Sequence, residues 1–306
     1  MSGIPARVRV VEVGPRDGLQ NESRQVPTRV KIELIERLAG AGLAAVEATS
    51  FVSPRWIPQL ADAEEVLSGL RRRRGTRYPV LVPNLQGLER AVAAGADELA
   101  VFTAASETFN RKNINAGIDE SLDRIRAVCE RAGEQSLSVR GYVSCVLGCP
   151  YEGPIAAEGV VSVARRLVDA GCYEVSLGDT IGAGTPAAAR DLAAAVAEAI
   201  GLDRVAIHFH DTRGQALANV FACMEIGVAT VDASVAGLGG CPYAQGATGN
   251  LATEDLVYML HGMGVDTGID LEALVDAGLF ISRALERGPA SRLGQIAALD
   301  PERANN

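Results

Sequence analysis

The sequence lacks a run of hydrophobic residues long enough to cross a membrane. The Ala-rich stretch 187–200 is interrupted by Arg190 and Asp191, whereas a membrane span needs about 18 uninterrupted apolar residues. Positive charge is also scarce, because 29 Lys and Arg stand against 38 Asp and Glu and give a net charge of −9. Phosphate binding relies on an excess of Lys and Arg, so we expect neither nucleic acid nor membrane as a partner.

Cys-x-x-Cys pairs are absent, and six cysteines in 306 residues are too few for a disulfide scaffold. We therefore expect reduced thiols. Strand-like sequence begins by Val8, which leaves little space for a presequence, so we expect a cytoplasmic protein. The one run of like charge, Arg71 to Arg74, is expected to be the solvated end of a helix that Gly75 stops.

No Gly-x-Gly-x-x-Gly follows the first strand-like segment, which disfavours a dinucleotide-binding open sheet. Instead, an Ala- and Leu-rich helical stretch repeatedly ends in a glycine suited to a left-handed cap, and a β-rich segment follows, at Gly42, Gly95, Gly171 and Gly227. With the other β-rich segments this gives eight strands, at Val8–Val13, Ala45–Ala48, Val80–Val82, Glu98–Phe102, Val139–Val143, Tyr173–Leu177, Val205–His210 and Thr230–Val235. We predict a single (β/α)8 TIM barrel over residues 1–306, an α/β fold, with a short C-terminal helical extension over roughly residues 267–306.

Alternation along the strands predicts a polar barrel interior, since residues two apart on a strand share a face. In 205–210 the helix-facing side is apolar, and the inner side carries Ala206, His208 and His210. Other polar residues that we expect to face inward are Glu12, Glu47, Glu174, Ser176, Asp232 and Ser234. Burying such groups is costly unless they are compensated, and a bound cation would compensate them.

His208 and His210 are two of only three histidines in the chain. On one strand face they project together, as two ligands of one metal ion do, although two hydrogen-bonded core histidines would give the same pattern. After the first strand, Arg16 and Asp17 follow a Gly-Pro turn. Asp17 can complete a two-histidine, one-carboxylate site suited to Mg²⁺ or Mn²⁺, and Arg16 can face developing oxyanion charge. Alone, an Arg-Asp pair is more often a surface turn.

The segment after the eighth strand, residues 237–250, contains five glycines in fourteen residues. Such a loop can open and close over a site, and it carries Cys241 within reach of the barrel mouth. A flexible connection with an ordinary free thiol is the alternative interpretation.

Together these segments resemble the 3-hydroxy-3-methylglutaryl-CoA lyase family. The resemblance runs over almost the whole chain and rests on residues 12–22, 47–58, 140–153, 178–182, 208–219 and 237–258. The family belongs to a barrel superfamily of metal-dependent lyases, synthases and carboxyl transferases that share the Arg-Asp and His-x-His elements. The Gly-Gly-Cys-Pro-Tyr-Ala sequence at 239–244 points to the lyase branch.

The resemblance implies a role for each matching residue. The implied ligands of a divalent cation, Mg²⁺ or Mn²⁺, are Asp17, His208, His210 and Asn250. Arg16 would polarise the thioester carbonyl and stabilise its enolate, and Glu47 would support the site. Asp179 and His208 are implied in proton transfer, and Cys241 as the loop thiol that helps to protonate the product. The family splits 3-hydroxy-3-methylglutaryl-CoA into acetyl-CoA and acetoacetate, usually in leucine breakdown and ketone-body formation.

The chain departs from the family at Arg213, where His-Asp-Thr-Tyr-Gly-Gln is usual. This cation could shift the preference toward another acidic 3-hydroxyacyl-CoA, or point to solvent. The expected partners are an acyl-CoA substrate and further copies of the chain, as a homodimer or larger homo-oligomer. Alternatives are a Claisen-condensing acyltransferase that joins a 2-oxo acid and acetyl-CoA, a metal-dependent hydrolase, and a non-catalytic metal-binding barrel. The hydrolase alternative is disfavoured because the chain offers no third histidine ligand, since His261 lies in a helical stretch.

Overall fold

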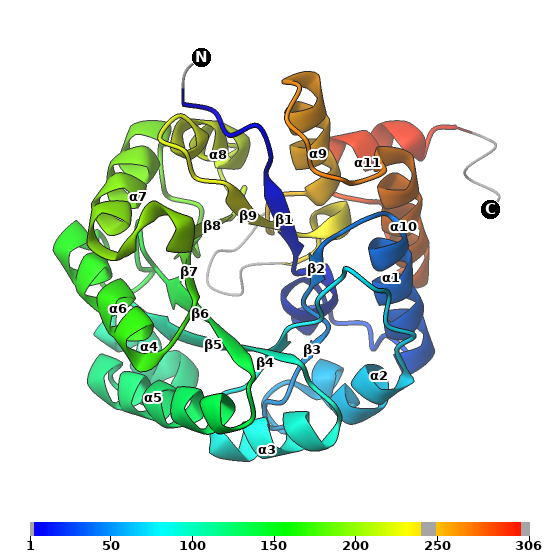
Figure 1. Ribbon diagram of the computed structural model, residues 1–306. Helices are drawn as coiled ribbons and strands as arrows, with labels where there is room; N and C mark the ends of the chain where they lie inside the picture. Colours follow the sequence, from blue (N-terminus) through cyan, green and yellow to red (C-terminus); the bar gives the residue numbers. More distant parts are fainter. Residues whose placement is uncertain (1–2, 240–248, 301–306) are drawn as a thin grey trace.

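The computed structural model describes residues 3–239 and 249–300. Within them, nine strands form one parallel sheet in the order β2-β1-β9-β8-β7-β6-β5-β4-β3, which curls into a barrel (Figure 1). The strands are β1 (Arg9–Glu12), β2 (Ala45–Val46), β3 (Thr49–Ser50), β4 (Val80–Leu81), β5 (Glu98–Ala104), β6 (Ser138–Ser144), β7 (Glu174–Asp179), β8 (Val205–Phe209) and β9 (Thr230–Ala233). β2 and β3, the first and last strands in this order, together take the place of the single strand predicted at 45–48. The observed segment extends to Ser50. β2 pairs with β1 and β3 with β4, so the predicted eight-stranded barrel is confirmed.

The helices form a ring outside the strands (Figure 1). They are α1 (Thr28–Gly40), α2 (Ala63–Gly69), α3 (Leu85–Ala93), α4 (Glu107–Ile114), α5 (Ile118–Glu134), α6 (Ala157–Ala170), α7 (Pro186–Ile200), α8 (Ala216–Met224), α9 (Thr253–Gly262), α10 (Leu271–Ala284) and α11 (Arg292–Ala297). Short turns lie at η1 (Gly14–Gly18), η2 (Pro58–Leu60), η3 (Leu202–Arg204) and η4 (Val235–Gly237). The last two helices lie in the predicted C-terminal extension, and α10 packs against α1 and α9, so it covers the outside of the barrel.

Glycines end four helical stretches and start the chain toward a strand, as predicted. Gly42, Gly95, Gly171 and Gly227 all have positive φ, between 84° and 115°. A side chain in this left-handed region is strained, whereas glycine adopts it freely. The recurring glycines in the sequence therefore mark the places where helices end and the chain turns toward the next strand.

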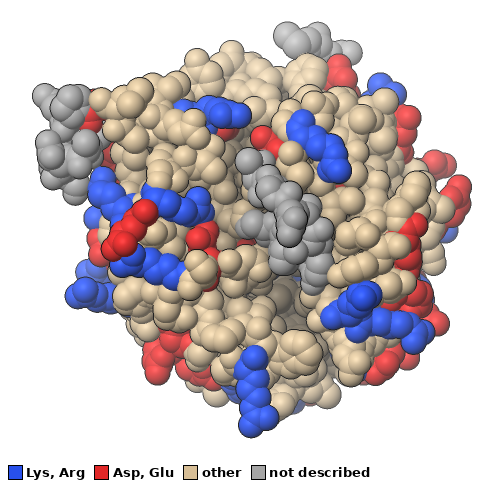
Figure 2. All heavy atoms as spheres, turned by 180° about the vertical axis from the view of Figure 1, so that it is seen from behind, with Lys and Arg blue, Asp and Glu red and all other residues tan. Residues whose placement is uncertain are grey.

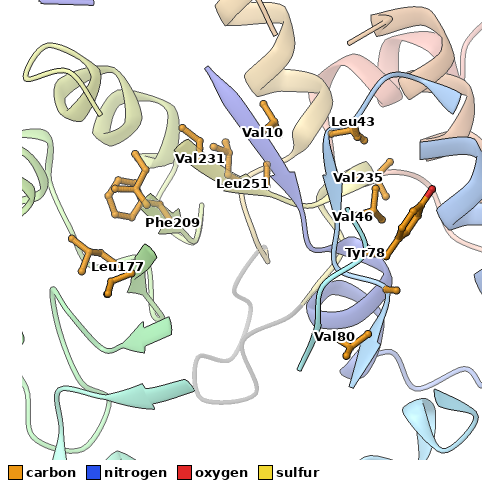
Figure 3. Packing of buried hydrophobic residues seen from close by; sticks show 14 of the residues in the cluster. Val10, Leu43, Val46, Tyr78, Val80, Leu177, Phe209, Val231, Val235 and Leu251 are labelled. Atoms are coloured by element: carbon orange, nitrogen blue, oxygen red, sulfur yellow. The ribbon is translucent and has the colours of Figure 1, made fainter. Parts of the chain in front are cut away.

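Apolar side chains fill the layer between the barrel and the helices (Figure 3). In β8, Val205, Ile207 and Phe209 belong to this core, whereas His208 and His210 face a cavity on the other side of the sheet, so the predicted alternation is confirmed there. The prediction for Glu12 was wrong, because this residue shares its face with Val10 and points toward the helices.

The carboxylate of Glu12 has a structural reason to lie outside the barrel. It accepts hydrogen bonds from the backbone N–H groups of Gly14 and Val235, at 2.7 and 2.9 Å, and from the hydroxyl of Thr253 at 2.7 Å. Burial raises the pKa of Glu12 to about 7, despite these three donors. Glu12 thus holds the turns that follow β1 and β9.

The arginine run also differs from its prediction. Helix α2 ends at Gly69, so residues 71–74 lie beyond the helix. Arg71 pairs with Glu36 on α1, and Arg72 pairs with Asp97 at 2.9 Å. The run ties neighbouring units together at the surface. Among the helices of residues 3–239 and 249–300, none has the length and hydropathy that crossing a membrane requires.

Candidate active site

A cavity of about 610 Å³ opens at the carboxyl ends of the strands. It is lined by Arg16, Asp17, Tyr142, His208 and His210, and it continues between apolar side chains toward α4 and α5. Seen from the side opposite to Figure 1, the surface has a hollow near its centre, with charged side chains of both signs around the periphery (Figure 2). In barrels of this kind, the site of chemistry lies on this face.

Strand β8 brings the two histidines together. The centroids of the rings of His208 and His210 lie 5.5 Å apart, and both side chains are about nine-tenths buried. Burial by itself lowers the pKa of His208, but a hydrogen bond to Asp232 and the charges of Asp17 and Asp232 outweigh it, so this pKa is raised. For His210, burial and the neighbouring His208 lower the pKa to about 4, which leaves its imidazole neutral at pH 7.

Asp17 reaches the histidines from the turn η1, which directly follows β1. The turn is held by the backbone N–H of Asp17, which donates to the carbonyl of Val13 at 2.7 Å. One carboxylate oxygen of Asp17, Oδ2, lies 3.8 Å from His208 Nε2. Burial would raise the pKa of Asp17, but the charges of Arg16 and the histidines lower it to about 2, so the carboxylate is ionised.

Asn250 lies beside this group. It is bridged to His210 through the backbone, and its side-chain amide donates to Asp17 Oδ2 at 2.8 Å and to the carbonyl of Leu238 at 3.2 Å. The four residues that the sequence predicts as metal ligands therefore meet at one place, from the turn after β1, the end of β8 and the segment before α9.

The donor set fits a hard divalent cation. The ligand atoms of Asp17, His208 and His210 all lie within 4.8 Å of one another. His210 Nδ1 and Asn250 Oδ1 are buried and have no hydrogen-bond partner among the described residues. Buried polar atoms are costly without a partner, and a cation would supply one. Carboxylate, imidazole and amide oxygen ligands without a thiolate suit Mg²⁺ or Mn²⁺.

Arg16 is fixed next to this group by two carboxylates. Its Nε donates to Glu47 Oε2 at 2.9 Å, one terminal nitrogen forms an ion pair with the same oxygen at 2.8 Å, and the other terminal nitrogen donates to Asp17 at 2.6 Å. Glu47 is fully buried at the junction of β2 and β3. Burial raises the pKa of Glu47, and the charge of Arg16 only partly opposes this. A guanidinium has five N–H groups, so N–H groups on both terminal nitrogens remain for a ligand.

Asp179 ends β7 and is turned toward its own loop. Its two oxygens accept hydrogen bonds from the backbone N–H groups of Ala183 and Gly184, at 3.0 and 2.8 Å. The cavity is lined there by its neighbours Gly178 and Thr180. Burial raises the pKa of Asp179 against these two hydrogen bonds. The carboxylate thus lies behind the cavity wall rather than in it.

Arg213 is exposed and interacts with the loop after β7. One guanidinium nitrogen donates to the carbonyls of Ile181 and Gly182, at 2.8 and 2.9 Å. Arg213 is not among the described residues that line the cavity. Arg213, at which the chain departs from the family that its sequence resembles, therefore braces the loop that follows Asp179.

Cys241 lies outside the described residues. The residues that flank residues 240–248, Gly239 and Gly249, are in backbone contact, because a Cβ atom on Gly249 would stand 1.3 Å from the carbonyl oxygen of Gly239. Only glycine fits there. The five cysteines within the described residues are all free thiols. His261 is part of α9 and its Nε2 is hydrogen-bonded to Thr267 at 2.9 Å, so the third histidine lies elsewhere.

Two residues at the site had no functional role in the predictions. They are Tyr142 and Asp232, of which Asp232 was predicted only to face the barrel interior. Tyr142 donates to Glu47 at 3.3 Å, and its ring lies against Arg16, with 5.6 Å between the guanidinium carbon and the ring centroid. Asp232 contacts His208 from β9. The alternation rule could have found Tyr142, because Arg140, Tyr142 and Ser144 alternate along β6.

The chain is similar to known lyases over nearly its full length. A family model described as HMGL-like matches residues 7–281. The protein named hydroxymethylglutaryl-CoA lyase, mitochondrial, of Gallus gallus is 58% identical over 294 residues, which are 96% of this chain and 99% of that protein.

Solved structures agree with this similarity. The crystal structure of hydroxymethylglutaryl-CoA lyase from Pseudomonas aeruginosa superposes with a TM-score of 0.94 at 53% identity, over 96% of this chain and 98% of that one. An HMG-CoA lyase from Acinetobacter baumannii, solved in complex with coenzyme A and 3-methylmalate, superposes with a TM-score of 0.91 at 39% identity, over 98% and 99% of the two chains.

Proposed function

The chain belongs to the HMGL-like family, and from this premise we propose that it is a lyase that cleaves 3-hydroxy-3-methylglutaryl-CoA to acetyl-CoA and acetoacetate. The observation that carries the proposal is the meeting of Arg16, Asp17, His208 and His210 at one cavity. A retro-Claisen cleavage needs a group that takes the proton of a tertiary alcohol and a cation that receives charge on a thioester oxygen.

The bond that breaks joins C2 and C3 of the acyl group. The hydroxyl on C3 loses its proton, C3 becomes the ketone of acetoacetate, and the electron pair passes to C2 as a thioester enolate. A proton delivered to C2 then gives acetyl-CoA, so atoms and charge balance without a further reactant.

We assign cation binding to Asp17, His208, His210 and Asn250. When bound there, Mg²⁺ or Mn²⁺ supplies a Lewis acid that lowers the pKa of the substrate hydroxyl. Asp17 contributes an ionised carboxylate, since its pKa is lowered to about 2, and His210 contributes a neutral imidazole. Both are the forms that bind a cation.

We assign the hydroxyl proton to Nε2 of His208, the ring nitrogen on the side of Asp17 at the cavity, which can accept this proton while it is not bound to the cation. Arg16 stabilises the enolate with the N–H groups of its terminal nitrogens that Glu47 and Asp17 leave available. Glu47 holds the guanidinium in position through one hydrogen bond and an ion pair. His208 and Arg16 thus act at opposite ends of the breaking bond, His208 at the hydroxyl on C3 and Arg16 at the enolate that includes C2.

Asp179 and Cys241 complete the assignment. Asp179 assists proton transfer through its electrostatic interaction with His208, from behind the cavity wall. Cys241 donates the proton that C2 receives. Its loop begins and ends at the contact of Gly239 with Gly249, near Asn250.

An acyl-CoA is the substrate class, in line with the coenzyme A bound in the related Acinetobacter baumannii structure. Because Arg213 braces a loop and does not line the cavity, we keep the methylglutaryl group as the acyl moiety. We also propose a homodimer or larger homo-oligomer in the cytoplasm, which light scattering after size exclusion and cell fractionation would test.

The test is to incubate the purified protein with Mg²⁺ or Mn²⁺ and a panel of 3-hydroxyacyl-CoA esters, and to follow acetyl-CoA and the released oxo acid by mass spectrometry. We expect both products from 3-hydroxy-3-methylglutaryl-CoA, and their loss in Arg16→Met. A parallel incubation with acetyl-CoA and 2-oxo acids examines the condensing alternative. Condensation without cleavage, or release of free CoA by hydrolysis, would contradict the proposal.

A further inference from the structure

A chain of buried charges runs through the interior of the barrel beneath the histidines. Arg140 on β6 donates to Asp232 on β9 through both terminal nitrogens, at 2.7 and 3.1 Å. Its Nε donates to Glu174 on β7 at 2.6 Å, and Glu174 also pairs with Arg9 on β1. Arg140, Glu174 and Asp232 are each at most 2% exposed. These ion pairs lie inside the barrel, so packing between the strands and the helices does not explain why charged residues occupy these positions.

Asp232, the member of this group of buried charges that lies nearest the cavity, contacts His208. Asp232 Oδ2 lies 3.3 Å from His208 Nδ1, and the same oxygen accepts a hydrogen bond from the hydroxyl of Ser176 at 2.7 Å. With Arg140 on its far side, Asp232 is held as a carboxylate in one orientation. An ionised carboxylate only accepts hydrogen bonds, so the ring nitrogen that faces it has to carry the hydrogen.

The two histidines differ in this respect. His208 has a carboxylate behind its Nδ1, whereas Nδ1 of His210 has no hydrogen-bond partner among the described residues. With the hydrogen on Nδ1, the lone pair of His208 is on Nε2, the nitrogen that lies 3.8 Å from Asp17 Oδ2. A carboxylate behind a metal-binding histidine fixes the tautomer and the orientation of the ring.

We propose that Asp232 is a positioning residue that holds His208 in the Nδ1–H tautomer, with Nε2 directed at the cation site, and that Arg140 and Ser176 hold Asp232 for this purpose. The proposal rests on the cation site of the proposed function, but not on the lyase reaction. Asp232 acts only through His208, and His210 is free of this constraint.

The first test uses the wild-type protein, so it does not depend on whether a variant folds. Because the chain has three histidines, a long-range ¹H–¹⁵N correlation spectrum of the histidine-labelled, Mg²⁺-loaded protein contains three ring systems, which His210→Gln and His261→Gln assign. We expect hydrogen on Nδ1 of His208 and none on Nε2. Hydrogen on Nε2 would overturn the proposal, whatever the activity of the enzyme. The expected tautomer in a protein without lyase activity would contradict only the proposed function.

The second test measures Mn²⁺ binding by calorimetry. Asp232→Asn keeps the side-chain volume but loses the carboxylate, and we expect Mn²⁺ affinity to fall by about 10- to 100-fold. Ser176→Ala removes one donor from the same oxygen and should have a smaller effect in the same direction. The matched control is Glu174→Gln, which removes the charge facing Arg140 Nε but leaves both bonds from Arg140 to Asp232, and should leave Mn²⁺ affinity within about twofold of wild type. Equal losses in Asp232→Asn and Glu174→Gln would mean that the charges only support the fold, and would refute the proposal.

Discussion

The ion pair between Arg16 and Glu47 leads to a prediction about stability that is separate from catalysis. Both side chains are buried, and one oxygen of Glu47 accepts a hydrogen bond from Arg16 Nε and pairs with a terminal nitrogen of Arg16. The other oxygen of Glu47 has no hydrogen-bond partner among the described residues. In Arg16→Met, Glu47 keeps only the hydroxyl of Tyr142, at 3.3 Å. Removing one partner of a buried ion pair costs about 3–5 kcal/mol, because the other charge stays buried without compensation.

The loss should be smaller when the remaining charge is removed as well. Glu47→Gln alone leaves Arg16 with Asp17, which accepts from it at 2.6 Å, so we expect a cost of about 1–3 kcal/mol. The double variant carries no uncompensated charge, so its cost should lie below the sum of the two single costs by about 2 kcal/mol. Since burial already raises the pKa of Glu47, Arg16→Met should also lose stability as the pH rises and Glu47 has to ionise.

The assay is urea unfolding of the four proteins, followed by circular dichroism in the presence of a chelator, so that cation binding does not contribute. Arg16→Lys is the matched control. It keeps a positive charge near Glu47 and should lose less stability than Arg16→Met, but it should lose turnover by orders of magnitude, because lysine cannot reproduce the guanidinium geometry. Costs that add within about 0.5 kcal/mol in the double variant would refute the reasoning, because independent sites behave in that way.

Three further predictions concern other parts of the molecule. Burial raises the pKa of Glu254 to about 8, so the folded protein keeps a proton that the unfolded chain releases, and stability should fall by up to about 1.4 kcal/mol per pH unit between pH 6 and 8. Glu254→Gln should flatten this slope in urea titrations, and an unchanged slope would mean that another group causes it. His210→Ala should weaken Mn²⁺ binding at least tenfold in calorimetry, since a ligand is lost, and unchanged affinity would count against its assignment. Cys241→Ala should lower kcat and leave the melting temperature unchanged, whereas a lower melting temperature with normal kcat would indicate a packing role.

The number and order of the strands could be predicted because the sequence marks the helix ends. Glycine is required where φ is positive, as at Gly95 and Gly171, and each such glycine precedes a strand. The pairing of His208 with Asp17 also followed from the sequence, since the carboxyl ends of all strands of a closed barrel meet on one face. Both predictions depend on backbone geometry, on positive φ at the helix ends and on the direction of the strands in a closed barrel.

Side-chain directions at strand ends could not be predicted in the same way. Glu12 was expected inside the barrel and lies outside, because the side that an isolated strand presents to the core is undetermined when both neighbours are valine. Asp179 turns toward backbone N–H groups of its own loop, whose path depends on Gly182 at φ +57°. The contact of Asp232 with His208 involves residues from two strands, so it depends on the register between β8 and β9. The alternation of residues along one segment does not contain the loop paths and strand registers that determine these contacts.

The charges inside the barrel also bear on how the chain reaches its fold. Valine and isoleucine pack almost equally well in several strand alignments, so an apolar interior tolerates slippage. Arg140, by contrast, finds its counter-charges on two other strands in one alignment only. A shift by a single residue turns a side chain to the opposite face of the sheet, and would strand a guanidinium in a dry interior. The polar centre therefore destabilises barrels whose strands pair in the wrong register. A purely apolar centre of the same volume would not distinguish these barrels from the native one.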